Sequence, residues 1–90
     1  MTLSEIFQQI DSQNPEDTIY ARSPWTLDSE ASVAVEGSEE EKRIKELGME
    51  YFLEIFIATD FLTDWKKSHS EPSTSEAACN RLIQYAINDA

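Results

Sequence analysis

The segment 50–57, Glu-Tyr-Phe-Leu-Glu-Ile-Phe-Ile, restricts the fold of this 90-residue chain more than any other. It is rich in aromatic and β-branched residues, which predicts a strand. Its odd-numbered residues would face one side of a sheet, and Phe52, Glu54 and Phe56 would face the other. A strand with apolar groups on both sides needs cover on both faces, so the segment predicts a central strand.

Two shorter segments predict the other strands. Residues 18–22 are rich in β-formers, and residues 31–36 alternate, with Val33 and Val35 on one side. The intervening segment 23–30 is too long for a tight turn. We therefore expect a hairpin with a wide loop.

Helical spacing predicts the remaining elements. Residues 3–10 place apolar side chains on one face after a Thr2/Glu5 capping box, and Asn14-Pro15 follows. Residues 38–47 are predicted to form a charged, exposed helix that Gly48 ends, with a mobile loop as the alternative. These two helices flank the predicted hairpin.

The C-terminal part predicts two further helices. One begins near Ala58, carries Phe61 and Trp65 on its apolar face as core residues, and ends at Lys66-Lys67. Residues 68–74 are a linker by composition, and a capping box of Ser73 with Glu76 starts the last helix. The apolar stripe of that helix consists of Ala78, Cys79, Leu82, Ile83, Ala86 and Ile87.

Together these elements predict a single α+β domain over residues 1–90. A small, mostly antiparallel three-stranded sheet packs with two to three helices, in the order α-β-β-(α)-β-α-α.

The charge of the chain restricts its ligands. It has 18 acidic and 7 basic residues, a net charge of -11, and residues 1–41 carry ten carboxylates against Arg22 alone. Such a field repels nucleic acid phosphates and anionic lipid headgroups, so we expect neither nucleic acid nor membrane as a partner. It attracts a basic protein surface.

The expected compartment follows from three features. Cys79 is the one cysteine, so no internal disulfide forms. The first five residues lack the basic and apolar regions of a signal peptide, and the apolar run 51–58 is too short to span a bilayer. These features predict a cytoplasmic protein.

Six residues are candidates for partner binding. Trp25 lies in the predicted loop with Asp28 and Glu30, and tryptophan beside an acidic rim is typical of interface hot spots. Glu39, Glu40 and Glu41 form an acidic run. The alternatives are that Trp25 folds back over the sheet and that the acidic run is simply solvated.

No catalytic, cofactor or metal site is predicted. His69 lies in the predicted linker without a second histidine, and Cys79 lies on an apolar stripe, which favours a buried structural thiol. Glycines 37 and 48 are the only two, which excludes phosphate-binding glycine loops. Glu54, flanked by two phenylalanines, is the alternative candidate for a reactive carboxylate, and it could instead pair with Arg22 or Arg81.

The hydrophobic pattern resembles that of a family of small bacterial proteins known only as a domain of unknown function. The resemblance covers about residues 3–67. It rests on the Ile19-Tyr20 strand, Trp25, the 31–35 strand, and the segment 48–55 leading into Asp60-Phe61-Leu62. It implies a compact α+β domain and gives no functional residues. Some small acidic bacterial domains also resemble immunity proteins that neutralise secreted toxins.

We therefore expect a non-enzymatic interaction domain for a basic partner. An inhibitor or an immunity-type protein would be a specific form of it. The alternatives are a ligand-binding or enzymatic domain with a pocket around Glu54, and a structural homodimer completed across the sheet.

Overall fold

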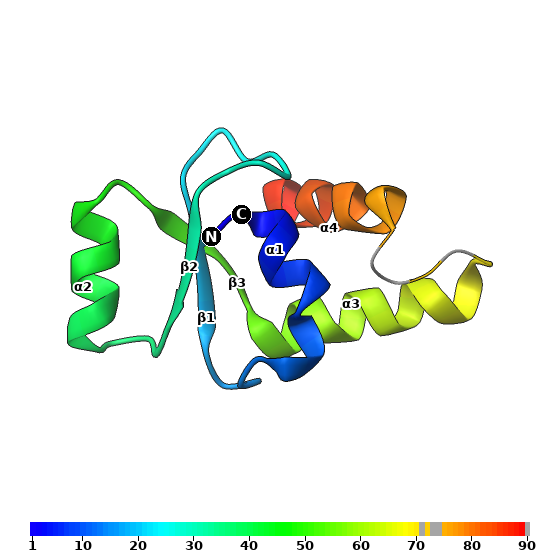
Figure 1. Cartoon of the computed structure of the whole chain (residues 1–90), viewed down its shortest axis with the longest axis horizontal. Coiled ribbons are helices and arrows are strands. Elements are labelled where there is room, and N and C mark those ends of the chain that lie inside the picture. Colours follow the sequence, from blue (N-terminus) through cyan, green and yellow to red (C-terminus); the bar gives the residue numbers. More distant parts are fainter. Residues whose placement is uncertain (71, 73–74, 90) are drawn as a thin grey trace.

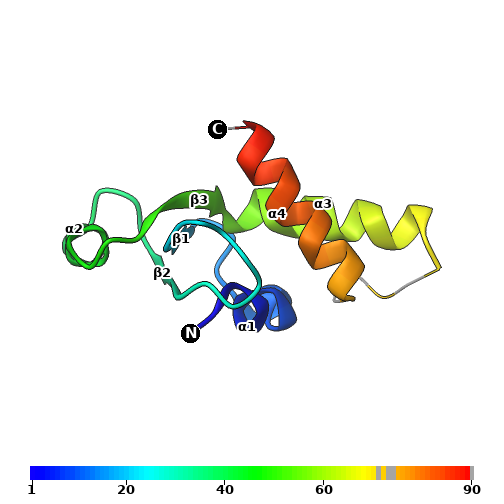
Figure 2. The ribbon, with the colours of Figure 1, turned by 90° about the horizontal axis from the view of Figure 1, so that it is seen from above.

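A computed structural model of the chain describes residues 1–70, 72 and 75–89 (Figures 1 and 2). The order of its elements confirms the predicted α+β fold class. In chain order they are α1 (Leu3–Gln8), the 3-10 helix η1 (Ile10–Ser12), β1 (Thr18–Ala21), β2 (Ala31–Ala34), α2 (Glu39–Glu46), β3 (Glu50–Glu54), α3 (Ile55–Ser68) and α4 (Glu76–Asp89).

The sheet is antiparallel throughout its described strands, in the order β2-β1-β3. Thr18 of β1 pairs with both Ala34 and Glu54, and Ala21 pairs with both Ala31 and Glu50. The predicted hairpin with a wide loop is confirmed. The prediction that residues 50–57 form the central strand is wrong, because β1 is central and β3 lies at an edge.

The last part of the predicted strand is helical. β3 ends at Glu54, and α3 begins at Ile55 instead of near Ala58. The backbone N–H of Ile55 donates to the Asp17 carbonyl (2.9 Å) and that of Phe56 donates to the Pro15 carbonyl (3.2 Å). The first amides of α3 therefore find acceptors in the turn before β1. These backbone carbonyls replace the side-chain cap that a helix otherwise needs at its start.

The predicted alternation of side chains in this strand is also broken. Ile19 pairs with Leu53 but Tyr20 pairs with Tyr51, so Phe52 is an extra residue on β3. Such a bulge re-aims side chains. As a result the consecutive residues Phe52 and Leu53 enter the same core, and each is 2% exposed.

Both faces of the sheet are covered, which explains why all four residues of β1 are buried. The main core lies between the sheet and helices α1, α3 and α4, and α2 lies on the opposite side (Figure 1). A second, smaller core joins α2 to the sheet. It consists of Tyr20, Ala34, Ile44 and Met49.

The helix ends follow the predicted capping chemistry in part. The Thr2/Glu5 capping box is present, Ser38 caps α2, and Gly48 adopts a φ of 92° just after that helix. Ser73 lies outside the described residues. In the described part, the hydroxyl of Ser75 accepts from the Ala78 amide at the start of α4 (3.1 Å).

Candidate interaction surface

The six predicted partner-binding residues do not form one surface. Trp25, Asp28 and Glu30 lie in the loop between β1 and β2, whereas residues 39–41 form the first turn of α2. β2 runs from that loop to the segment before α2, so the two groups lie at opposite ends of the sheet (Figure 1). Four strand residues separate these ends by about 13 Å.

Trp25 folds back over the sheet. Its indole packs edge-on against the ring of Phe52, with centroids 4.9 Å apart and an interplanar angle of 75°. Its Nε1–H donates to the Ala21 carbonyl (3.2 Å). The half-buried ring therefore contributes to the main core, and its predicted role as a hot spot stays a prediction.

Part of the loop's acidic rim is neutralised. The Arg22 guanidinium donates to Glu30 (3.0 Å), and both side chains are about half exposed. The alternative pairing of Arg22 with Glu54 is therefore not formed. Asp28 is exposed.

Glu41 anchors α2 to the sheet. The Tyr20 hydroxyl donates to its carboxylate, the Gly37 amide donates to it (3.2 Å), and the Lys45 ammonium lies 3.8 Å away. The hydrogen bond from Tyr20 is the main reason that the pKa of Glu41 is lowered. Burial, reinforced by Glu41, raises the pKa of Tyr20. Only 16% of the Glu41 side chain is exposed, which leaves little of it to a partner.

The sheet gathers another set of carboxylates that the sequence did not place together. Because Thr18 pairs with both Ala34 and Glu54, the turn before β1, the segment after β2 and the end of β3 meet at one end of the sheet. We call this the acidic end. Its members are Glu16, Asp17, Glu36, Glu39, Glu40 and Glu54.

On α2, Lys42 and Arg43 lie close to Glu39 and Glu40. The other members of the acidic end have no lysine or arginine within two positions in the sequence. Residues 15–18, 35–41 and 54–56 contain no lysine or arginine. Two large apolar side chains are exposed in the same segments, Val35 at 59% and Phe56 at 48%. Pairing of the two predicted strands 18–22 and 31–36 was the sequence signal that would have joined Asp17 to Glu36.

Glu54 occupies the junction of β3 and α3 and is half-buried. Its side chain makes no capping hydrogen bond at the start of α3. A hollow beside β2, between Met1 and Leu47, is not lined by Glu54. The alternative of a pocket around Glu54 stays a prediction.

The remaining candidates have structural surroundings. The His69 ring stacks on Trp65 (3.7 Å between centroids) at the end of α3, so the prediction of a linker residue is corrected to a helix-end residue. Cys79 is 1% exposed, and burial raises the pKa of its thiol to about 11, as expected of a structural cysteine. Phe61 and Trp65 are half-buried against the main core.

Two general findings concern the described part of the chain. Among these residues, no three histidine, cysteine or acidic side chains converge closely enough to hold a metal ion. No helix within residues 1–70, 72 and 75–89 combines the length and apolar character needed to cross a membrane.

Comparison with protein-family models gives no match, and searches of curated proteins and of solved structures find no similar protein. The resemblance to a bacterial domain of unknown function stays an expectation.

Proposed function

We propose that this chain is a cytoplasmic, non-enzymatic interaction domain that binds a basic protein surface. An inhibitor or immunity-type protein for a basic toxin or nuclease is its most specific form. The observation that carries the proposal is the acidic end, where six carboxylates from three separated segments share one end of the sheet.

The spacing of these carboxylates favours long-range attraction. Within the described residues they do not converge enough to chelate a metal ion. Glu16, Glu36, Glu39 and Glu40 are exposed to solvent. The field of such charges is screened beyond about 8–10 Å at physiological salt, so it acts most strongly on a partner that has come close to this end of the sheet. With a net charge of -11 behind it, this end of the sheet would steer a basic surface and accelerate association.

Short-range contacts would come from the same region. Val35 and Phe56 offer exposed apolar surface beside the carboxylates. Apolar groups surrounded by a polar rim are typical of binding surfaces. Trp25 suits this role less well, because its loop is at the other end of the sheet and its ring is already packed against Phe52.

The test begins with affinity capture from the native lysate at low salt, followed by salt-step elution and mass spectrometry. The association rate of the purified partner is then measured with a variant of the acidic end, Glu36→Gln/Glu39→Gln/Glu40→Gln. The matched control, Asp28→Asn/Asp64→Asn/Glu76→Gln, removes the same charge from exposed residues elsewhere.

We expect the acidic-end variant to associate more slowly than the control, with circular dichroism confirming that both are folded. Equal rates for the two variants would show that only net charge matters. A slower rate for the control would locate the binding surface elsewhere and would refute the role of the acidic end.

A further inference from the structure

β2 presents backbone hydrogen-bonding groups at its outer edge. The Arg22 amide donates to the Glu30 carbonyl (2.9 Å), which fixes the alternation of this antiparallel pair. Ser32 and Ala34 therefore direct their N–H and C=O groups toward β1, while Ala31 and Val33 direct theirs outward. The Ala31 amide donates outward to the Met1 carbonyl (2.7 Å), which agrees with this alternation.

Only the start of this edge is covered. Thr2 forms a bridge with Glu30, and the Met1 carbonyl reaches Ala31. Among the described residues, no backbone partner faces the outward groups of Val33. The edge ends at Val35, whose carbonyl accepts from the Ser38 amide (3.1 Å) as the chain turns toward α2.

The two edges of the sheet differ. The bulge at Phe52 interrupts the regular pairing of β3, and bulges are a common protection of sheet edges against added strands. β2 pairs with β1 in register through all four of its residues. Its outer edge is therefore the more regular template for another strand.

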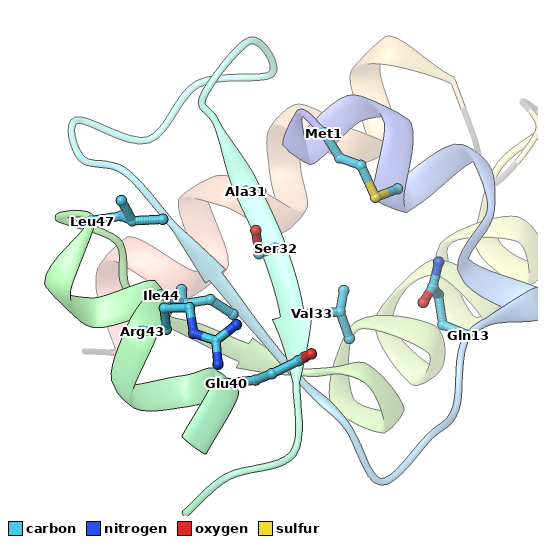
Figure 3. A pocket seen from close by; sticks show the side chains of 9 residues that line it. All are labelled: Met1, Gln13, Ala31, Ser32, Val33, Glu40, Arg43, Ile44 and Leu47. Carbon is cyan, nitrogen blue, oxygen red and sulfur yellow. The ribbon is translucent and has the colours of Figure 1, made fainter. Parts of the chain in front are cut away.

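A hollow of about 380 Å³ surrounds this open edge (Figure 3). On one side of β2 it is lined by Ile44 of α2 and by Leu47 just after that helix, and on the other by Met1 beside Val33. Leu47 is 58% exposed and Met1 is 54% exposed. Because side chains alternate along a strand, an added strand would direct one set of its side chains toward α2 and the other set toward Met1.

We propose that the β2 edge binds an extended, basic segment of the partner as an additional strand. This inference rests on the proposed function and gives it a recognition mode, since backbone hydrogen bonds to Val33 supply affinity and the hollow supplies side-chain contacts. Glu40 lines the hollow beside Arg43, and Glu36 and Glu39 follow β2 directly.

Charge selects this occupant over a second copy of the chain. Edge-to-edge pairing of two copies would bring two net charges of -11 together. A segment that alternates apolar and basic residues instead combines hydrogen bonding at the edge with attraction to the acidic end. Its basic side chains would lie near Glu36 and Glu40.

The test uses the unmodified protein and two capped heptapeptides of equal charge. One alternates lysine with valine, and the other alternates lysine with proline, which cannot pair as a regular strand. Affinity is measured by fluorescence anisotropy, and hydrogen exchange of the Val33 amide is measured by NMR. We expect the lysine–valine peptide to bind at least about tenfold more tightly and to slow exchange of the Val33 amide about tenfold or more.

The variant Val33→Pro removes the outward N–H without removing one that faces β1, and it should weaken binding of the lysine–valine peptide by about tenfold. The exchange measurement on the unmodified protein keeps the test valid if this variant does not fold. Equal binding of both peptides with an unprotected Val33 amide would overturn the strand-addition inference and leave attraction of a basic surface intact.

Two further outcomes are distinct. In the first, exchange of the Val33 amide slows when the protein concentration alone is raised, without peptide, and sedimentation equilibrium shows a dimer. That result would make a second copy of the chain the occupant and overturn the inference. Protection of Val33 by the lysine–valine peptide, with no salt-sensitive basic partner, would support the strand-addition site and refute the proposed function.

Discussion

Truncation of Ile44 should loosen α2 from the sheet. Ile44 is the buried residue of α2 and is 8% exposed within the small second core. Ile44→Ala deletes three carbon atoms, which at about 0.8 kcal/mol per buried methylene costs about 2.4 kcal/mol before any cavity effect. Because α2 has solvent on its outer side and can settle inward, we expect a total cost of about 2–3 kcal/mol.

Native-state hydrogen exchange measures this cost for α2 separately from the rest. We expect the amides of residues 43–47 to exchange about 30-fold faster or more in Ile44→Ala, which corresponds to about 2 kcal/mol. The control Leu82→Ala removes a buried side chain of the main core, on α4. It should lower the free energy of global unfolding and leave the local opening of α2 unchanged.

The reasoning would be refuted if Leu82→Ala accelerated exchange in α2 as much as Ile44→Ala does. That result would mean that α2 opens only when the whole domain unfolds. The two cores would then form a single cooperative unit, and the second core would have no independent stability.

Three further predictions concern Glu41, Trp25 and Cys79. The pKa of Glu41 is below its ordinary value of 4.5, so its stabilising effect is present above that pH and is lost as pH falls. Urea unfolding from pH 6 to pH 3 should show this loss, and Tyr20→Phe should make it smaller. Trp25→Ala should lower the free energy of unfolding by about 2 kcal/mol, because loss of the half-buried indole uncovers Phe52. The salt dependence of partner association should not change. Cys79, with a pKa of about 11, should react with a thiol reagent at pH 8 only as fast as the domain unfolds, and faster labelling would contradict its burial.

Local sequence signals were sufficient for much of the fold. The Thr2/Glu5 capping box, the charged helix before Gly48 and the two short strands each follow from neighbouring residues. The boundary between β3 and α3 does not, because the carbonyls that receive the first helical amides belong to Pro15 and Asp17. The strand pattern of residues 50–57 was accordingly extended three residues too far.

The candidate site shows the same division. Trp25 and the run 39–41 stood out because each is conspicuous along the chain. The acidic end was missed because strand pairing brings Asp17, Glu36 and Glu54 to one end of the sheet from distant positions. Which residues of β2 direct their N–H and C=O groups outward likewise depends on the register between β1 and β2.

The central claim is that the acidic end recruits a basic partner. The most direct measurement is the association rate of the captured partner with the unmodified domain as salt is raised. We expect the rate to fall about tenfold or more between ~0.01 M and ~0.15 M salt, and to fall less for Glu36→Gln/Glu39→Gln/Glu40→Gln. An association rate that stays constant over this range would contradict the account.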